Sequence, residues 1–182
     1  MIRRAFVPAL SILIANAAFA FGSPLGIRHT AAIVPAPITI TFSDLSDLYG
    51  YIAQSRGLGA RNDSELTKRI AASSRVVQVH DGSADPILVI KADVLDQGGH
   101  SRLRSSNGNY PFYVLRVTED RLVLLGTMFG ADYRHRLDGR QLRFEVRLRT
   151  GPHTTKAMTF LVDGIRLVNL SAPPLPPIAS YG

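Results

Sequence analysis

One loop of the sequence places a histidine beside groups suited to acid–base chemistry on an anion. His100 follows two glycines in segment 98–104, and Arg102 and Arg104 come two and four positions later. An imidazole can act as a general acid or base, and guanidinium groups can stabilise negative charge that develops on a substrate. Glycine also lets a ligand approach the backbone closely. The loop is a candidate catalytic site, and a loop without chemistry is the alternative.

His135 is the second candidate for a general acid or base. It lies in segment 132–137, in which the polarity of the side chains alternates. Because side chains alternate across a strand, His135 shares the face of Tyr133, which predicts the inner face. A histidine in that position is more typical of a hydrogen-bonded core residue than of a catalyst.

Several classes of active site are disfavoured by what the chain lacks. It contains no cysteine, which excludes thiol nucleophiles, disulfides and cysteine-based zinc sites. It contains no Gly-x-Ser-x-Gly elbow, His-Glu-x-x-His motif or glycine-rich phosphate loop. The five histidines are scattered without the spacing of metal ligands, so we expect neither a metal nor a cofactor. A glycosidase needs two carboxylates that flank the bond, and only three glutamates and no tryptophan occur.

An arginine-rich hairpin is the strongest indication of a binding surface. Asp138-Gly139 lies between two alternating segments, and Asp-Gly is a strong signal for a two-residue hairpin loop. The predicted inner face carries Tyr133, His135, Leu142, Phe144, Val146 and Leu148. The predicted outer face carries Arg134, Arg136, Gln141, Arg143, Glu145, Arg147 and Arg149.

The predicted hairpin loop places Arg134 opposite Arg143, and like charges opposite each other destabilise a strand pair. Glu145, on the diagonal, offers one carboxylate for several guanidinium groups. The remaining positive charge must be solvated or must meet an anionic polymer or an acidic protein surface. The residues predicted to bind such a partner are Arg134, Arg136, Arg143, Arg147, Arg102 and Arg104.

The elements that would position these residues are two helices followed by strands. Apolar spacing predicts a helix from Ser43, as its cap, to Gly57, and a second from Asn62 or Asp63 toward Ser73, with Glu65 closing an Asn-x-x-Glu box. Period-two segments follow at 76–80, 86–90, 111–118, 121–129, 132–137, 140–149, 156–162 and 165–170. The sequence predicts an α+β, mostly β fold: an antiparallel meander that forms a β-sandwich or partly open barrel, with two short helices before it.

The ends of the chain predict export. Residues 1–20 combine Arg3 and Arg4, a short apolar run and the motif Ala18-Phe19-Ala20, which is typical of a cleavable signal peptide. We expect a linker or lead-in strand over 21–42, a single β-rich domain over 43–171, and a flexible proline-rich tail over 172–182. No later segment is apolar enough to span a membrane. The expected location is extracellular, or periplasmic in a bacterium.

Three functions remain open. The net charge is +7, carried by 18 arginines and 3 lysines against 14 acidic residues. The first function is a secreted, non-catalytic binding protein, for example an effector or a surface-interaction factor, with an arginine-rich face for an anionic partner. The second is a secreted hydrolase or lyase that acts on RNA or an acidic polysaccharide. The third is an envelope-associated structural β-protein.

Overall fold

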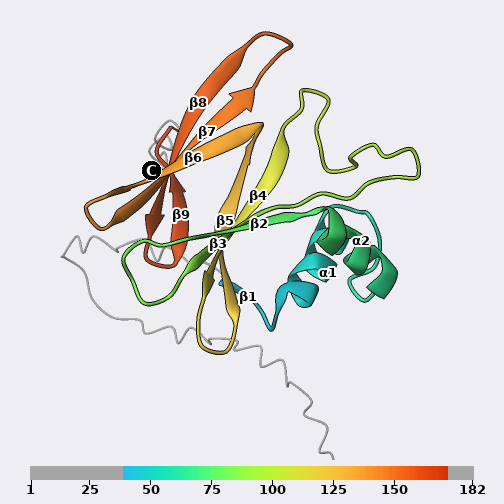
Figure 1. The fold of residues 1–182 in the computed structure, drawn as a ribbon, viewed down its shortest axis with the longest axis horizontal. Coiled ribbons are helices and arrows are strands. Elements are labelled where there is room, and N and C mark those ends of the chain that lie inside the picture. The colour runs from blue at the N-terminus through green and yellow to red at the C-terminus, as the bar shows by residue number, and fades with distance from the viewer. Residues whose placement is uncertain (1–38, 172–182) are drawn as a thin grey trace, which may run out of the picture. The chain divides into compact units, whose positions relative to one another are not determined.

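The computed structural model describes residues 39–171 (Figure 1). The predicted signal peptide, nearly all of the lead-in segment and the proline-rich tail lie outside the described residues. The elements, in chain order, are β1 (Ile40–Phe42), α1 (Leu45–Ser55), α2 (Ser64–Ser73), β2 (Arg75–Val79), β3 (Ile87–Lys91), β4 (Tyr110–Val117), β5 (Leu122–Gly130), β6 (Asp132–Asp138), β7 (Gln141–Arg149), β8 (Thr155–Asp163) and β9 (Arg166–Asn169).

The strands form two antiparallel sheets, which confirms the predicted α+β, mostly β class. The five-stranded sheet has the order β1-β5-β4-β3-β2, and the four-stranded sheet has the order β6-β7-β8-β9. They stack as in a sandwich, and no closed barrel forms among the described residues. The lead-in strand belongs to the domain, because β1 pairs with β5.

Two apolar clusters hold three layers together. Phe112 and Val114 of β4 share one cluster with Phe144 of the four-stranded sheet. The intervening residues Tyr113 and Leu115 share the other cluster with the two helices. Since adjacent side chains of a strand point to opposite faces, the five-stranded sheet is covered on both faces.

The cap of α1 lies one residue later than predicted, whereas α2 is capped by Asp63, one of its two predicted starting residues. The carboxylate of Asp44 accepts a hydrogen bond from the backbone N–H of Asp47, and that of Asp63 accepts one from the N–H of Leu66. An aspartate at this position satisfies an N–H group that has no partner within the helix. Ser43 therefore is not the cap of α1, and the predicted box that starts at Asn62 does not form.

The chain passes between the sheets at Gly130, which lies between the predicted strands 121–129 and 132–137 of one meander. A Cβ atom on Gly130 would lie 2.3 Å from Val146 Cγ1 and 2.9 Å from the carbonyl oxygen of Arg147. The backbone N–H of Ala131 donates to the same carbonyl oxygen at 2.8 Å. Only glycine fits this corner, and the predicted continuous meander is therefore divided into two sheets.

The loop between β6 and β7 consists of Gly139 and Arg140 rather than of Asp138-Gly139. Gly139 has a φ of 62°, and Asp138 pairs with Gln141 as the last residues of the two strands. The predicted pairing of Arg134 with Arg143 is therefore wrong. Each residue of β6 faces a partner two positions further along β7 than predicted. Because this shift is even, every residue stays on its predicted face.

Candidate functional site

The outer face of the four-stranded sheet gathers the arginines that the sequence predicted there. In the strand register, Arg134 of β6 lies opposite Glu145 of β7, and Arg136 lies opposite Arg143. Their neighbours Tyr133, Phe144 and Val146 pack against the apolar cluster between the sheets. The alternation of β6 and β7 thus separates guanidinium groups from the core, as expected for a half-covered sheet.

Besides the predicted Glu145, two aspartates lie on this face. Asp132 binds Arg147 through both oxygens, Asp138 lies 3.5 Å from Arg143, and Glu145 lies 3.7 Å from Arg136. Asp132 and Asp138 are separated from Arg134 and Arg136 by even numbers of residues, so all four side chains point to the same face of β6. The alternation alone could have placed them there, and the face is more neutral than predicted.

Two arginines of this face have no carboxylate partner among residues 39–171. Neither Arg134 nor Arg149 is within salt-bridge distance of an acidic group in that range, and both are exposed. The Nε of Arg143 is buried and makes no hydrogen bond with any described residue. The N–H groups of these three arginines could therefore donate hydrogen bonds to a bound anion.

A second group of cations surrounds Tyr110 at the end of β4. The Nζ of Lys91 lies 3.6 Å from the Tyr110 ring centroid, and the guanidinium carbon of Arg104 lies 5.9 Å from it. A Cβ on Gly108 would lie 3.0 Å from Arg104 Nη2 and 3.2 Å from Arg149 Nη1, so these two guanidinium groups flank Gly108. Predicted site residue Arg104 is therefore close to the outer face.

Asn109 fixes this end of the sheet. Its side chain is buried, donates to the carbonyl oxygen of Arg149 at 2.8 Å, and accepts from the N–H of Arg149 at 2.8 Å. Two such bonds tie loop 105–109 to the end of β7. The backbone that carries Arg104 and Arg149 is thereby positioned by a side chain that the sequence analysis did not single out.

His100 lies on an exposed loop without the partners of a catalytic group. Its side chain is 84% exposed, and its Nδ1 lies 3.5 Å from Oδ1 of Asp96. Hydrogen bonds from the backbone N–H groups of His100 and Gly98 lower the pKa of the Asp96 carboxyl. The neighbouring Ser101 hydroxyl donates to Asp93. His100 and Arg104 line one shallow hollow of about 480 Å³, which does not include Arg102.

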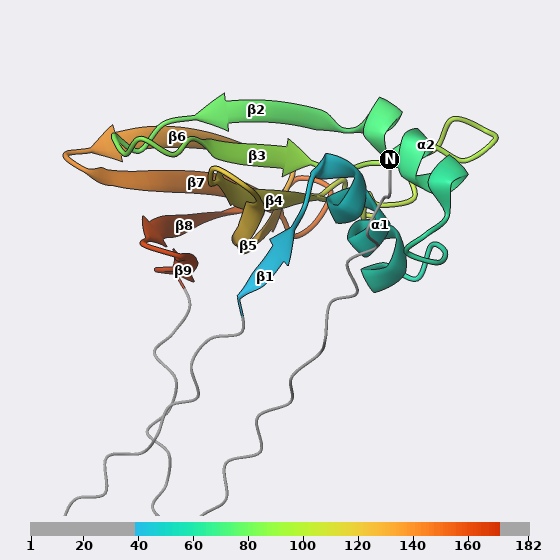
Figure 2. The ribbon, with the colours of Figure 1, turned by 90° about the horizontal axis from the view of Figure 1, so that it is seen from below.

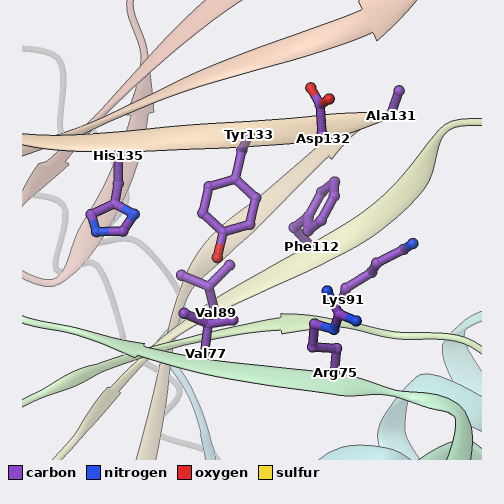
Figure 3. Close-up of a pocket in the computed structure, with 9 residues that line it drawn as sticks. All are labelled: Arg75, Val77, Val89, Lys91, Phe112, Ala131, Asp132, Tyr133 and His135. Carbon is purple, nitrogen blue, oxygen red and sulfur yellow. The ribbon is translucent and has the colours of Figure 1, made fainter.

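His135 is exposed, and the prediction of a buried core position is wrong (Figure 3). It has the inner-face position expected from alternation, with its ring centroid 6.5 Å from that of Phe144. However, β6 is an edge strand, and the five-stranded sheet does not cover its far end. His135 lines a cleft between the sheets, separate from the hollow that contains His100.

Comparison with known proteins assigns no function to this surface. No protein-family model, no curated protein and no solved structure matches it. Within residues 39–171, no three histidine or acidic side chains gather as metal ligands. Over the same range, no helix is long and apolar enough to cross a membrane. The arguments on function therefore rest on the geometry of the domain.

Proposed function

We propose that this protein is a secreted, non-catalytic binding protein that presents the outer face of its four-stranded sheet to an anionic polymer or an acidic protein surface. The observation that carries the proposal is the pair of exposed arginines, Arg134 and Arg149, that lack a carboxylate partner among the described residues. They lie among three further arginines, Arg136, Arg143 and Arg147, on a sheet whose other face is packed. The predicted signal peptide supports a place outside the cytoplasm.

The paired arginines of this face remain accessible to a ligand. The pair of Arg147 and Asp132 is about half exposed on both sides, and exposed ion pairs contribute roughly 0.2–1 kcal/mol. An anionic polymer can replace such a carboxylate at little cost. Strands lie about 4.8 Å apart, so the sheet fixes the spacing of the backbone positions from which these arginines extend.

The structure does not bring the two candidate catalytic histidines together in one site. The two candidate histidines, His100 and His135, line separate hollows, and the hydroxyl of Ser101, which follows His100 in the chain, donates to Asp93. The structural, envelope-associated alternative remains a prediction, and size-exclusion chromatography tests it, since it requires a stable oligomer.

The test measures binding to heparin and to polyuridylate at several salt concentrations. The double variant Arg134→Gln/Arg149→Gln should bind about tenfold more weakly, and the dependence of log affinity on log salt should become shallower by about two. The matched control is Lys68→Gln/Arg121→Gln, which removes the same charge from α2 and the loop between β4 and β5. Equal weakening of both double variants would show that only net charge matters, and the proposal would fail.

A further inference from the structure

A cleft lies between the two sheets at the side where β2 and β6 form their edges. Figure 2 shows these two edge strands on the same side of the domain. Its volume is about 390 Å³, within the range of pockets that hold small ligands. Its lining residues come from both sheets: Arg75, Val77, Val89, Lys91, Phe112, Ala131, Asp132, Tyr133 and His135. The inner surface of the sandwich is thus accessible from this side.

One part of the cleft is apolar and firmly packed. Val89 and Phe112 are buried, and the Phe112 ring meets the Tyr133 ring edge to face with centroids 5.2 Å apart. Figure 3 shows the side chains of Val77 and Val89 rising toward the Tyr133 hydroxyl. Rigid apolar walls of this kind favour the flat or branched hydrocarbon body of a ligand.

The other part of the cleft is positively charged, and the only favourable partner described above for either cation is the Tyr110 ring, which lies 3.6 Å from the Lys91 ammonium. Arg75 and Lys91 stand directly opposite each other on β2 and β3, an arrangement that destabilises a strand pair. Among the described residues, no carboxylate lies within salt-bridge distance of either one. The carboxylate that lines the cleft, Asp132, binds Arg147 on the outer face. An anion between the two cations would relieve their repulsion.

Two further donors face the same space. Neither the Tyr133 hydroxyl nor the His135 ring makes a hydrogen bond with any residue of the range 39–171, although both line the cleft. Burial raises the pKa of the Tyr133 hydroxyl, so this group keeps its proton and remains a donor. Cations and free donors thus border one apolar wall, the arrangement that recognises an organic acid rather than a neutral hydrocarbon.

We propose that this cleft binds a small organic carboxylate with an aromatic or branched apolar body. Its carboxylate lies between Arg75 and Lys91, and its body lies against Val89, Phe112 and Tyr133. This site is distinct from the outer arginine face, because the side chains that would hold the ligand, unlike that of Asp132, belong to the inner side of the sandwich. It adds a small-molecule ligand to the proposed binding of a polymer.

The test uses 2-naphthoate, with the neutral 2-naphthalenemethanol as the matched probe, in isothermal titration calorimetry. The native protein should bind the acid at least about tenfold more tightly than the alcohol, since a charged hydrogen-bonded pair is worth that factor or more. Arg75→Gln and Lys91→Gln should each remove about tenfold of the affinity for the acid. Lys68→Gln is the control with the same loss of charge.

Two readouts make the outcome decisive. Amide chemical shifts should change on β2, β3 and β6, and the double variant Arg134→Gln/Arg149→Gln should bind 2-naphthoate as the native protein does. Arg75 is exposed on an edge strand, so its replacement leaves the fold intact, which circular dichroism verifies. Equal binding of acid and alcohol, insensitivity to Arg75 and Lys91, or shifts confined to the outer face would overturn the proposal.

Discussion

The two sheets use arginine–aspartate pairs in opposite ways. Arg116 of β4 binds Asp81 at 2.7 Å, with side chains that are 14% and 11% exposed. Arg147 of β7 binds Asp132 with side chains that are 55% and 54% exposed. The chemical groups are the same, but burial decides their role. If one member is removed, water can hydrate the remaining charge of the exposed pair, whereas the remaining charge of the first pair stays largely shielded from water.

The surroundings of the buried pair explain what it stabilises. Arg116 also donates to the Ser83 hydroxyl at 2.8 Å and to the carbonyl oxygen of Gly164 at 3.4 Å. One side chain therefore connects β4, the loop between β2 and β3, and the turn between β8 and β9. The exposed pair connects only the neighbouring strands β6 and β7, which are already joined by backbone hydrogen bonds.

The largest effect should come from breaking the buried pair. Arg116→Met leaves the Asp81 carboxylate buried without a counter-charge, which should lower the free energy of unfolding by about 3 kcal/mol. Urea unfolding followed by circular dichroism measures this loss. Arg147→Met is the control on the exposed pair and should cost less than about 1 kcal/mol. Equal losses in the two variants would show that burial does not distinguish the pairs.

A second, smaller effect concerns acid. Burial alone would raise the pKa of Asp81, but the hydrogen bonds from Arg116 and Ser83 outweigh it and lower the pKa from 3.8 to about 2. Since the pKa is lower in the folded state, the pair stabilises the fold fully above about pH 4, and this contribution disappears as the pH falls toward 2. The contribution is on the order of 2 kcal/mol.

Unfolding of the native protein and of Asp81→Asn between pH 6 and pH 2 isolates this contribution, because the other carboxylates titrate in both. The difference in unfolding free energy between them should shrink as the pH falls below 4. A constant difference across this range would mean that the Asp81 carboxylate titrates alike in the folded and unfolded chain.

The smallest effect on stability should accompany a change in binding. Asp132→Asn releases Arg147 from its carboxylate and should cost less than about 1 kcal/mol of unfolding free energy. The same change should strengthen binding to heparin, because one more guanidinium group on the outer face becomes available. Salt-dependent binding assays measure this gain. Weaker heparin binding would indicate that Asp132 positions Arg147 for the ligand rather than competing with it.

Sequence patterns predicted local structure better than long-range arrangement. The strict alternation of β7 identified its buried and exposed faces, because a side-chain period of two follows from strand geometry. The corner at Gly130 escaped prediction, because a glycine between two predicted strands fits a hairpin and a change of sheet equally well. The contact with Val146 that requires glycine is visible only in three dimensions.

The binding residues were predictable to different degrees. Arg134 and Arg149 followed from alternation, and the same rule would have found Asp132. Arg75 and Lys91 could not be linked to Tyr133, because the residues are far apart in sequence and meet only when the sheets stack. For His135 the predicted inner face was right and the predicted burial was wrong, since alternation does not reveal where the facing sheet ends.

The change of sheet at Gly130 also sets the order in which the two sheets are synthesised. All strand pairs of the described residues lie either within 40–130 or within 132–169, so a ribosome delivers the helices and the whole first sheet before any strand of the second. In that interval Phe112, Val114 and Met128, which the second sheet later covers, face water. The nascent chain is therefore most exposed to self-association just before its last strands emerge.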